Sequence, residues 1–272
     1  MITSFYKPST FAEAVEIFRR EDSPIYLGGG TIVNSLGFAK EVQDQELAII
    51  SLAGLPINNI ELSSSELVIG AGVTIQDLIE SDKVFPAIKE AAKLVVNRNV
   101  RNIATVGGNV AFHGSSCNIA AMLLAMDVQL ELHDGEKTRL VSFTDYHTHH
   151  EPYEIIVALH VPRCFESYNY AVRRYVRTQN DISILLAYAL AKGNAEKIED
   201  LRLVMGGVDE IAVHLTEIES LKGQQLPTRE DLASKIHEII HPLADLRGSV
   251  AFKKEVGAQI AAWVVYKALG QL

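Results

Sequence analysis

Two glycine-rich turns, far apart in the chain, restrict its fold more than any other feature. The first is Gly28–Thr31, directly after the apolar run 25–27, and the second is Ala104–Asn109, which holds a glycine pair. Glycine adopts positive φ without strain and lets a backbone approach a ligand closely. Successive backbone N–H groups in such a turn form a concave site for an anion. Each turn alone also fits an ordinary strand-to-helix connection or a bulge, but two that converge predict a site that holds a diphosphate from both sides.

The composition is that of an ordinary globular protein. The chain has 272 residues, of which 48% are hydrophobic and 22% charged, enough for two or three domains. Its formal net charge of -9 disfavours nucleic acid as a partner, and phosphate binding would have to use directed backbone dipoles. The first residues lack a signal-peptide pattern, and no apolar run is long enough to cross a bilayer. We therefore expect a cytoplasmic protein without a membrane partner.

Cysteine and histidine do not indicate a metal centre. Cys117 and Cys164 cannot supply the four thiolates of an iron–sulfur cluster, and we expect both to be reduced. His147, His149 and His150 are close in sequence, but the segment 145–152 is polar and is predicted to be a solvated loop. No nucleophile and base can be paired from spacing alone, so we predict no catalytic residue.

Two common nucleotide-binding motifs are missing from the sequence. Gly70-Ala71-Gly72 follows an apolar run, but Ile75 stands where the dinucleotide fingerprint needs a glycine. The chain also contains no phosphate-binding loop of the Gly-Lys-Ser/Thr type. These absences argue against a Rossmann dehydrogenase and against an ATPase.

Apolar spacing predicts a first small subdomain at residues 1–55. Thr10 is a helix cap, and the apolar residues 11, 14, 15 and 18 after it follow helical spacing. Short strands are expected at 25–27 and 46–51. Together they predict a βαβ-like unit with parallel strands.

Two further parts follow, at residues 56–164 and 165–272. In the second part we expect strands and helices at 67–69, 74–79, 86–95, 118–126, 128–132, 138–141 and 155–161. In the third part we expect strands at 168–177, 182–191 and 201–205, then helices at 214–221, 231–240 and 249–269. The predicted fold is therefore α/β plus α+β: a small parallel subdomain, a larger mixed or antiparallel subdomain, and a C-terminal antiparallel sheet with helices.

Six stretches of the chain resemble one known family in the same order. The family is the FAD-binding medium subunit of the molybdenum hydroxylases related to xanthine dehydrogenase and carbon-monoxide dehydrogenase. The matching stretches are Leu27–Thr31, Val100–Asn109, Leu123–Asp127, Arg177 with Asp181–Ser183, Gly206–Val208 with Leu221–Gly223, and Asp245–Ser249 with Phe252–Lys254. They span nearly the whole chain.

The resemblance implies a function as well as a fold. FAD would lie extended between the two α/β subdomains, 1–55 and 56–164. Electrons from a molybdenum-cofactor large subunit would pass through an iron–sulfur small subunit into this flavin and on to NAD or another acceptor. The protein would orient and tune the flavin ring.

The resemblance also implies which residues contact FAD, by backbone or side chain. Arg173 stands where the family usually has Lys, and it would lie near the flavin. The residues implied are Tyr26, Leu27, Gly28, Gly29, Gly30, Thr31, Ile32, Val33, Val95, Ala104, Thr105, Val106, Gly107, Gly108, Asn109, Asn118, Ile156 and Arg173. Arg101 has two interpretations, a phosphate contact or a structural salt bridge.

The chain departs from the family pattern at three places. Ile32 replaces an acidic residue, Gly114-Ser115 replaces Ser-Pro, and Asn118 replaces Asp. An amide oxygen can still accept a hydrogen bond, but a carboxylate accepts a stronger one. These departures support an alternative hypothesis, an interaction or structural subunit of the same fold with degenerate FAD binding. A third hypothesis is a stand-alone flavin reductase.

Overall fold

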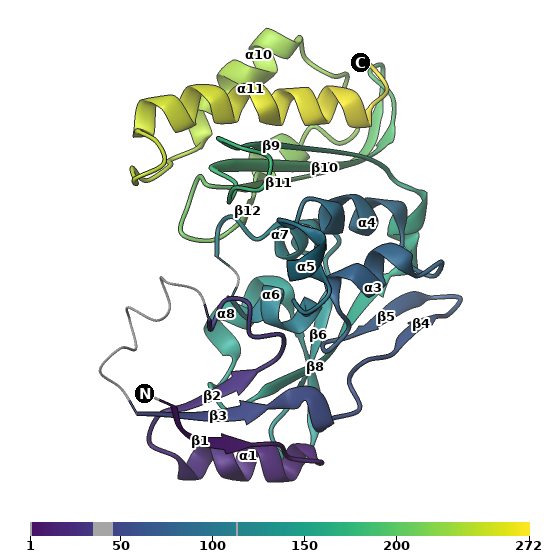
Figure 1. Cartoon of the computed structure of the whole chain (residues 1–272). Coiled ribbons are helices and arrows are strands. Elements are labelled where there is room, and N and C mark those ends of the chain that lie inside the picture. The colour runs from purple at the N-terminus through teal and green to yellow at the C-terminus, as the bar shows by residue number, and fades with distance from the viewer. Residues whose placement is uncertain (1, 35–45, 113) are drawn as a thin grey trace. The chain divides into compact units, whose positions relative to one another are not determined.

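The computed structural model describes residues 2–34, 46–112 and 114–272 (Figure 1). The chain divides into two compact units, each made of three separate segments. Unit 1 contains residues 1–84, 97–112 and 127–161, and unit 2 contains residues 85–96, 113–126 and 162–272. The three contiguous domains expected from the sequence remain a prediction.

Unit 1 begins with a small parallel sheet. Its strands are β1 (Ile2–Tyr6), β2 (Pro24–Leu27) and β3 (Leu47–Ser51), in the order β1-β3-β2. All pairings are parallel, and every residue of the central strand β3 is buried. Helix α1 (Phe11–Arg20) contacts β2 and β3, and the Thr10 hydroxyl accepts the Glu13 N–H at 3.2 Å. The predicted helix and parallel strands are confirmed, whereas β1 was missed because its short sequence is half exposed.

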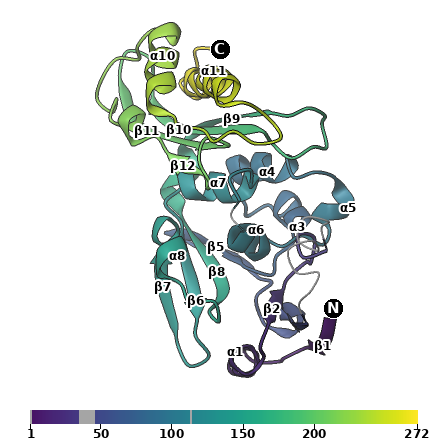
Figure 2. The same cartoon turned by 90° about the vertical axis from the view of Figure 1, so that its left-hand side faces the viewer.

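A five-stranded sheet completes the strands of unit 1, in the order β4-β5-β8-β6-β7. Its strands β5, β8, β6 and β7 are labelled in Figure 2. The strands are β4 (Ile60–Leu62), β5 (Glu66–Gly70), β6 (Gln129–His133), β7 (Thr138–Ser142) and β8 (Ile155–Pro162). The α-helices of this unit that follow α1 are α3 (Ile75–Glu80), α5 (Arg98–Arg101), α6 (Val106–Phe112) and α8 (Phe143–His149). Short 3₁₀ turns lie at Leu52–Gly54 and, in unit 2, at Arg163–Ser167.

Helix α8 corrects the prediction of a polar loop at 145–152. The Ser142 hydroxyl accepts the Asp145 N–H at 3.1 Å and so caps the helix. Phe143 and Tyr146, three positions apart, are both buried. The polar residues between them hid this helical spacing.

Unit 2 is built around the antiparallel sheet β12-β11-β10-β9. Its strands are β9 (Asn169–Tyr175), β10 (Leu185–Gly193), β11 (Ile198–Gly206) and β12 (Val213–His214), and its helices are α4 (Pro86–Lys93), α7 (Asn118–Ala125), α9 (Thr216–Glu219), α10 (Arg229–Ile239) and α11 (Val250–Ala268). Strand β10 is apolar along most of its length and contacts both α11 and α7 (Figure 1). The helix expected at 214–221 is only one turn, because β12 pairs with β11 at Val213 and His214.

Among the described residues, Val96 (φ 24°) and Asp127 (φ 50°) are the non-glycine residues with positive φ. Val96 is the last residue of one segment of unit 2, and Asp127 is the first residue of one segment of unit 1. Positive φ is strained for a β-branched residue such as valine. Both positive-φ positions therefore mark points where the backbone leaves one unit for the other.

Candidate cofactor site

The two glycine loops meet in unit 1. A Cβ atom built on Gly29 would lie 1.7 Å from the carbonyl oxygen of Ile103, and one built on Gly28 would lie 2.7 Å from Thr105 Oγ1. Neither distance leaves room for a side chain. The predicted convergence of the two loops is therefore confirmed, and these glycines are needed because the loops touch.

The first loop turns at Gly30. This residue has φ +70°, and the Asn34 N–H donates to the Gly30 carbonyl at 3.0 Å. Strand β2 ends at Leu27, immediately before the loop, and its pairing with the buried β3 fixes where the loop starts.

The second loop is held by the segment 71–75. Ile75 N–H donates to Ala104 O at 2.9 Å, Val106 N–H to Val73 O at 2.9 Å, and Gly107 N–H to Ala71 O at 2.8 Å. A Cβ on Gly107 would lie 2.7 Å from the Cβ of Ala71, so this glycine also allows close backbone contact. The sequence predicted that this glycine pair lies in an open turn. It lies instead in the first turn of α6.

Several amides of the second loop already have acceptors inside the chain. Besides Val106 and Gly107, the Gly108 N–H donates to Thr105 Oγ1 at 3.1 Å and the Asn109 N–H donates to Thr105 O at 3.0 Å. A hydroxyl that accepts one bond still has a proton to donate. The Thr105 hydroxyl can therefore donate to an anion.

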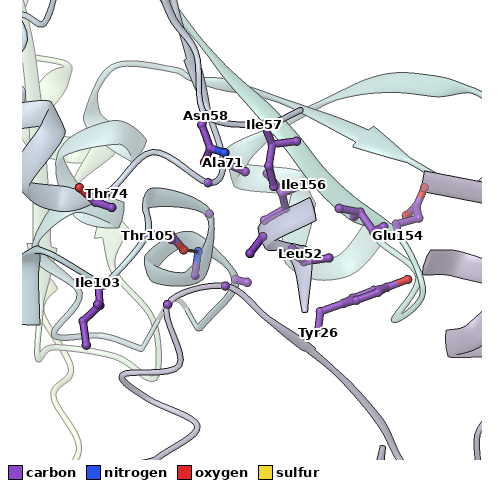
Figure 3. A pocket seen from close by; sticks show the side chains of 18 of the residues that line it. Tyr26, Leu52, Ile57, Asn58, Ala71, Thr74, Ile103, Thr105, Glu154 and Ile156 are labelled. Atoms are coloured by element: carbon purple, nitrogen blue, oxygen red, sulfur yellow. Dashed lines mark hydrogen bonds between the residues drawn. The ribbon is translucent and has the colours of Figure 1, made fainter. Parts of the chain in front are cut away.

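A cavity of about 570 Å³ opens beside the two loops (Figure 3). Seven of the sequence-predicted cofactor residues line it: Tyr26, Gly28, Gly29, Thr105, Gly107, Gly108 and Ile156. Figure 3 shows Thr74 and Ile103 on one side of Thr105, and Leu52, Tyr26 and Glu154 on the other. The cavity therefore extends to both sides of the glycine loops.

The other predicted residues of unit 1 do not line the cavity. They lie in or directly beside the two loops: Leu27, Gly30, Thr31, Ile32, Val33, Ala104, Val106 and Asn109. Ile32 is 36% exposed. Arg101 donates from Nε to the side-chain amide oxygen of Gln76 at 3.1 Å.

Three predicted residues belong to unit 2. Val95 is buried just beyond α4. Asn118 donates to the Leu94 carbonyl at 3.3 Å and accepts from the Ser183 hydroxyl at 3.4 Å. The Arg173 guanidinium lies 4.6 Å from the centre of the Trp263 ring, a cation–π contact. Their roles toward a cofactor remain predictions.

One wall of the cavity was missed by the sequence reasoning. Tyr146, His150, Pro152 and Glu154 line the cavity, and they come from α8 and the turn that follows it. The ring of His150 stacks on that of Tyr146 with centroids 4.3 Å apart. The Ser142 cap and the spacing of Phe143 and Tyr146 were the signals that could have revealed this wall.

Two tyrosines and one glutamate that line the cavity have shifted pKa values. Burial raises the pKa of Tyr146 to about 12 and also raises the pKa of Tyr26, so both phenols stay protonated at neutral pH. Burial of the Glu154 carboxyl disfavours its ionisation, but hydrogen bonds from Arg139 and from the Glu151 N–H outweigh this and lower its pKa. Glu154 is therefore an anion paired with Arg139.

The part of the chain that the structure describes contains no group of three or more His, Cys, Asp or Glu residues arranged to hold a metal ion. Within the same residues, no helix has both the length and the apolar character needed to span a bilayer.

Comparisons with known proteins agree with this geometry. Residues 1–164 match the family model described as the FAD binding domain in molybdopterin dehydrogenase, and residues 170–268 match the CO dehydrogenase flavoprotein C-terminal domain. The uncharacterized protein YgfM of Escherichia coli K12 is 27% identical over 96% of this chain and 95% of its own. The xanthine dehydrogenase FAD-binding subunit of Escherichia coli O157:H7 is 27% identical over 92% of this chain and 90% of its own.

A solved structure has the same fold. Carbon monoxide dehydrogenase from Hydrogenophaga pseudoflava, in a form that lacks the Mo-pyranopterin moiety, gives a TM-score of 0.91 at 24% identity. The match covers 100% of this chain and 98% of that chain. The predicted fold class is confirmed.

Proposed function

Because the chain belongs to the family of FAD-binding medium subunits of the molybdopterin dehydrogenases, we propose that it carries electrons through a non-covalently bound FAD. In this proposal the electrons arrive from iron–sulfur clusters on a partner subunit and leave to NAD or another acceptor. The chain is thus one component of an oxidoreductase, and FAD supplies the redox chemistry when bound.

The contact between the two glycine loops carries this proposal. Atoms of Thr105 and Ile103 already fill the space that a Cβ would need at Gly28 and at Gly29, respectively. Gly28 and Gly29 therefore present main-chain atoms without side chains to the cavity. A diphosphate can approach such a backbone surface closely. The residues present fit the group.

The two loops have different proposed roles. In the second loop the amides of residues 106–109 donate within the chain. We therefore assign the amides that meet the diphosphate mainly to residues 28–33, and a hydroxyl contact to Thr105. Tyr26 and Ile156 would contact the rest of the cofactor in unit 1.

Val95, Asn118 and Arg173 keep their proposed roles from the family resemblance. A guanidinium near the flavin would favour the anionic reduced ring. The Arg173 guanidinium contacts the Trp263 ring. Among the described residues, no carboxylate forms an ion pair with it. In this proposal, Arg173→Gln lowers the reduction potential of the bound flavin.

The proposed partners are an iron–sulfur small subunit and a molybdenum-cofactor large subunit. Cys117 is buried with its pKa raised to about 12 by that burial, and Cys164 is exposed. Two such cysteines cannot hold a cluster of the four-thiolate kind. The clusters must then lie on another chain.

Titration of the purified chain with FAD, followed by flavin absorbance, tests the proposal. We expect saturable binding of one FAD per chain in the wild type. Gly108→Val should abolish binding without unfolding the chain, since the atom near its added Cβ is the side-chain oxygen of Thr105 at 3.0 Å. Ala12→Val, on the exposed face of α1, is the control. A folded wild-type chain that binds no FAD contradicts the proposal.

One observation favours the second candidate, a structural subunit that has lost efficient FAD binding. Ser115 Oγ accepts the Gly207 N–H at 2.6 Å and donates to the Ile211 carbonyl at 3.3 Å, so this departure from the family pattern stabilises unit 2. Co-purification with a large and a small subunit, with no flavin in the complex, would select this candidate. NADH turnover by the isolated chain would instead select a stand-alone flavin reductase.

A further inference from the structure

The segment 149–154, which we name the strap, is tied to strand β7 by an ion pair between the exposed Arg139 and the buried carboxylate of Glu154. Arg139 Nε and Nη2 donate to the two carboxylate oxygens of Glu154, each at 2.7 Å. Arg139 Nη2 also donates to the His149 carbonyl, at the end of α8 where helix carbonyls lack intrahelical partners. The Glu154 side chain is only 5% exposed. One guanidinium therefore fixes both ends of the strap.

A second anchor holds the strap from the three-stranded sheet. The Tyr26 hydroxyl, on β2, donates to the Tyr153 carbonyl at 2.8 Å. From α1, the Arg19 guanidinium lies 4.1 Å from the centre of the Tyr153 ring. Strand β2 runs directly into the first glycine loop. The same strand thus connects the strap to the loop proposed to bind the diphosphate.

The strap forms one end of the cavity. His150, Pro152 and Glu154 belong to it and line the cavity together with Tyr26 and Tyr146. Figure 3 shows Tyr26 and Glu154 at the same end, across Thr105 from Thr74 and Ile103. This end combines aromatic and aliphatic surfaces, which suit the face of a planar heterocycle.

We infer that Arg139 and the Tyr26 hydroxyl position the strap and so set the width of this end of the cavity. We place the ADP half of FAD at this end because the residues assigned to the flavin, such as Arg173, belong to unit 2. The inference rests on the proposed function. Each residue ties the strap to a different sheet, so loss of either anchor leaves the wall held on one side only. A wall displaced by a fraction of an ångström loses contact with the ligand while the fold persists.

Two variants test the anchors separately. Glu154→Gln keeps the side-chain volume and removes the charge that Arg139 binds, and Tyr26→Phe removes only the hydroxyl. The matched control is Glu80→Gln, which removes the charge of an exposed Arg–Glu pair in the same unit, 2.9 Å apart and outside the cavity. For each protein we would measure the Kd for FAD and the Ki of ADP as a competitor of FAD, after circular dichroism has shown a native spectrum.

The expected result is a rise of about tenfold in both the FAD Kd and the ADP Ki for each anchor variant, and no change for the control. If the FAD Kd and the ADP Ki rise by the same factor, the lost contacts are those to the ADP half of FAD. A general loosening of the fold would not give the same factor for both ligands. Unchanged values in both anchor variants, a change in FAD Kd without one in ADP Ki, or absence of ADP competition in the wild type would overturn the inference. A wild type that binds no FAD at all would instead overturn the proposed function and this inference with it.

Discussion

Single glycines in this chain are explained by close contact more often than by φ. Among the glycines of the first loop that line the cavity, Gly28 and Gly29 have no positive φ, and their added Cβ atoms would strike the second loop. Gly30 is the position in this loop where positive φ is required. The sequence could show that glycine was needed here, but the identity of the contacting atoms depends on which distant residues lie opposite.

Gly29→Ala tests this contact at one atom. We expect the added methyl group to push the loop away from the Ile103 carbonyl, with a loss of about 1–3 kcal/mol in the free energy of unfolding. Urea denaturation measures this loss. Gly108→Ala, where a side-chain oxygen lies at 3.0 Å, should cost less than Gly29→Ala. Equal stability of Gly29→Ala and wild type would show that the loops do not touch in solution.

The Arg139–Glu154 pair gives a pH-dependent contribution to stability. The pKa of Glu154 is lowered below its usual value of 4.5 in the folded chain because the bonds from Arg139 and the Glu151 N–H outweigh the opposing effect of burial. A group with a lowered folded pKa stabilises the fold above its unfolded pKa, and this contribution is lost as the pH falls through the folded pKa. The contribution is therefore complete at neutral pH and disappears in acid.

We expect the wild type to be more stable than Glu154→Gln at neutral pH, with a difference that shrinks as the pH falls below 4.5. The measurement is the free energy of unfolding of both proteins from neutral pH down to about pH 3. A difference that stays constant over this range would mean that the ionised carboxylate contributes nothing. Removing the charge of the buried Glu154 carboxylate should cost more than removing that of the exposed Glu80 carboxylate in the Arg98–Glu80 pair.

The helices show which elements sequence can predict. Helices with a Ser or Thr cap and an apolar stripe, such as α1, α3 and α11, were predicted close to their observed bounds. Helix α8 has the same type of cap, but of its residues whose burial is described only Phe143 and Tyr146 are buried. The wall of the candidate site that α8 supports was therefore missed. Local patterns reveal an element only when enough of its residues face the core.

The cap of α11 can be tested directly. Ser249 Oγ accepts the Phe252 N–H at 3.2 Å, at the start of the helix that packs on β10. Ser249→Ala should cost about 1 kcal/mol, since a first-turn N–H loses its acceptor. Urea denaturation would measure the change, and Thr178→Ala, in an exposed loop, is the control. Equal losses in both variants would rule out a capping contribution.

At the scale of the whole molecule, unit 1 and unit 2 do not follow the domain boundaries that the sequence predicted. The C-terminal part was expected to begin at residue 165, yet unit 2 also contains α4 and α7 from earlier in the chain. Helix α7 contacts β10 and β11, and all eight of its residues are buried. A boundary drawn along the sequence cannot reveal which sheet a buried helix covers. Apart from Asn118, the residues of α7 are apolar, and such a sequence does not indicate which surface the helix packs against.

A fragment of residues 165–272 should therefore fail to fold cooperatively. Without α4 and α7, the sheet of unit 2 would expose the apolar surface that these helices normally cover. Urea unfolding followed by circular dichroism, together with binding of a hydrophobic dye, would measure this. A sigmoidal transition and no dye binding by the fragment would contradict the expectation, with the full chain as the reference.

The interleaved segments also affect the order in which the nascent protein can fold. The last residue of unit 1 is Val161, so this unit can complete its core, glycine loops included, while the ribosome is still adding the strands of unit 2. During that interval α4 and α7 have left the exit tunnel without the sheet that will bury them. Newly made chains thus display an uncovered apolar helix for as long as about a hundred residues take to translate, and this interval is when a chaperone would be needed.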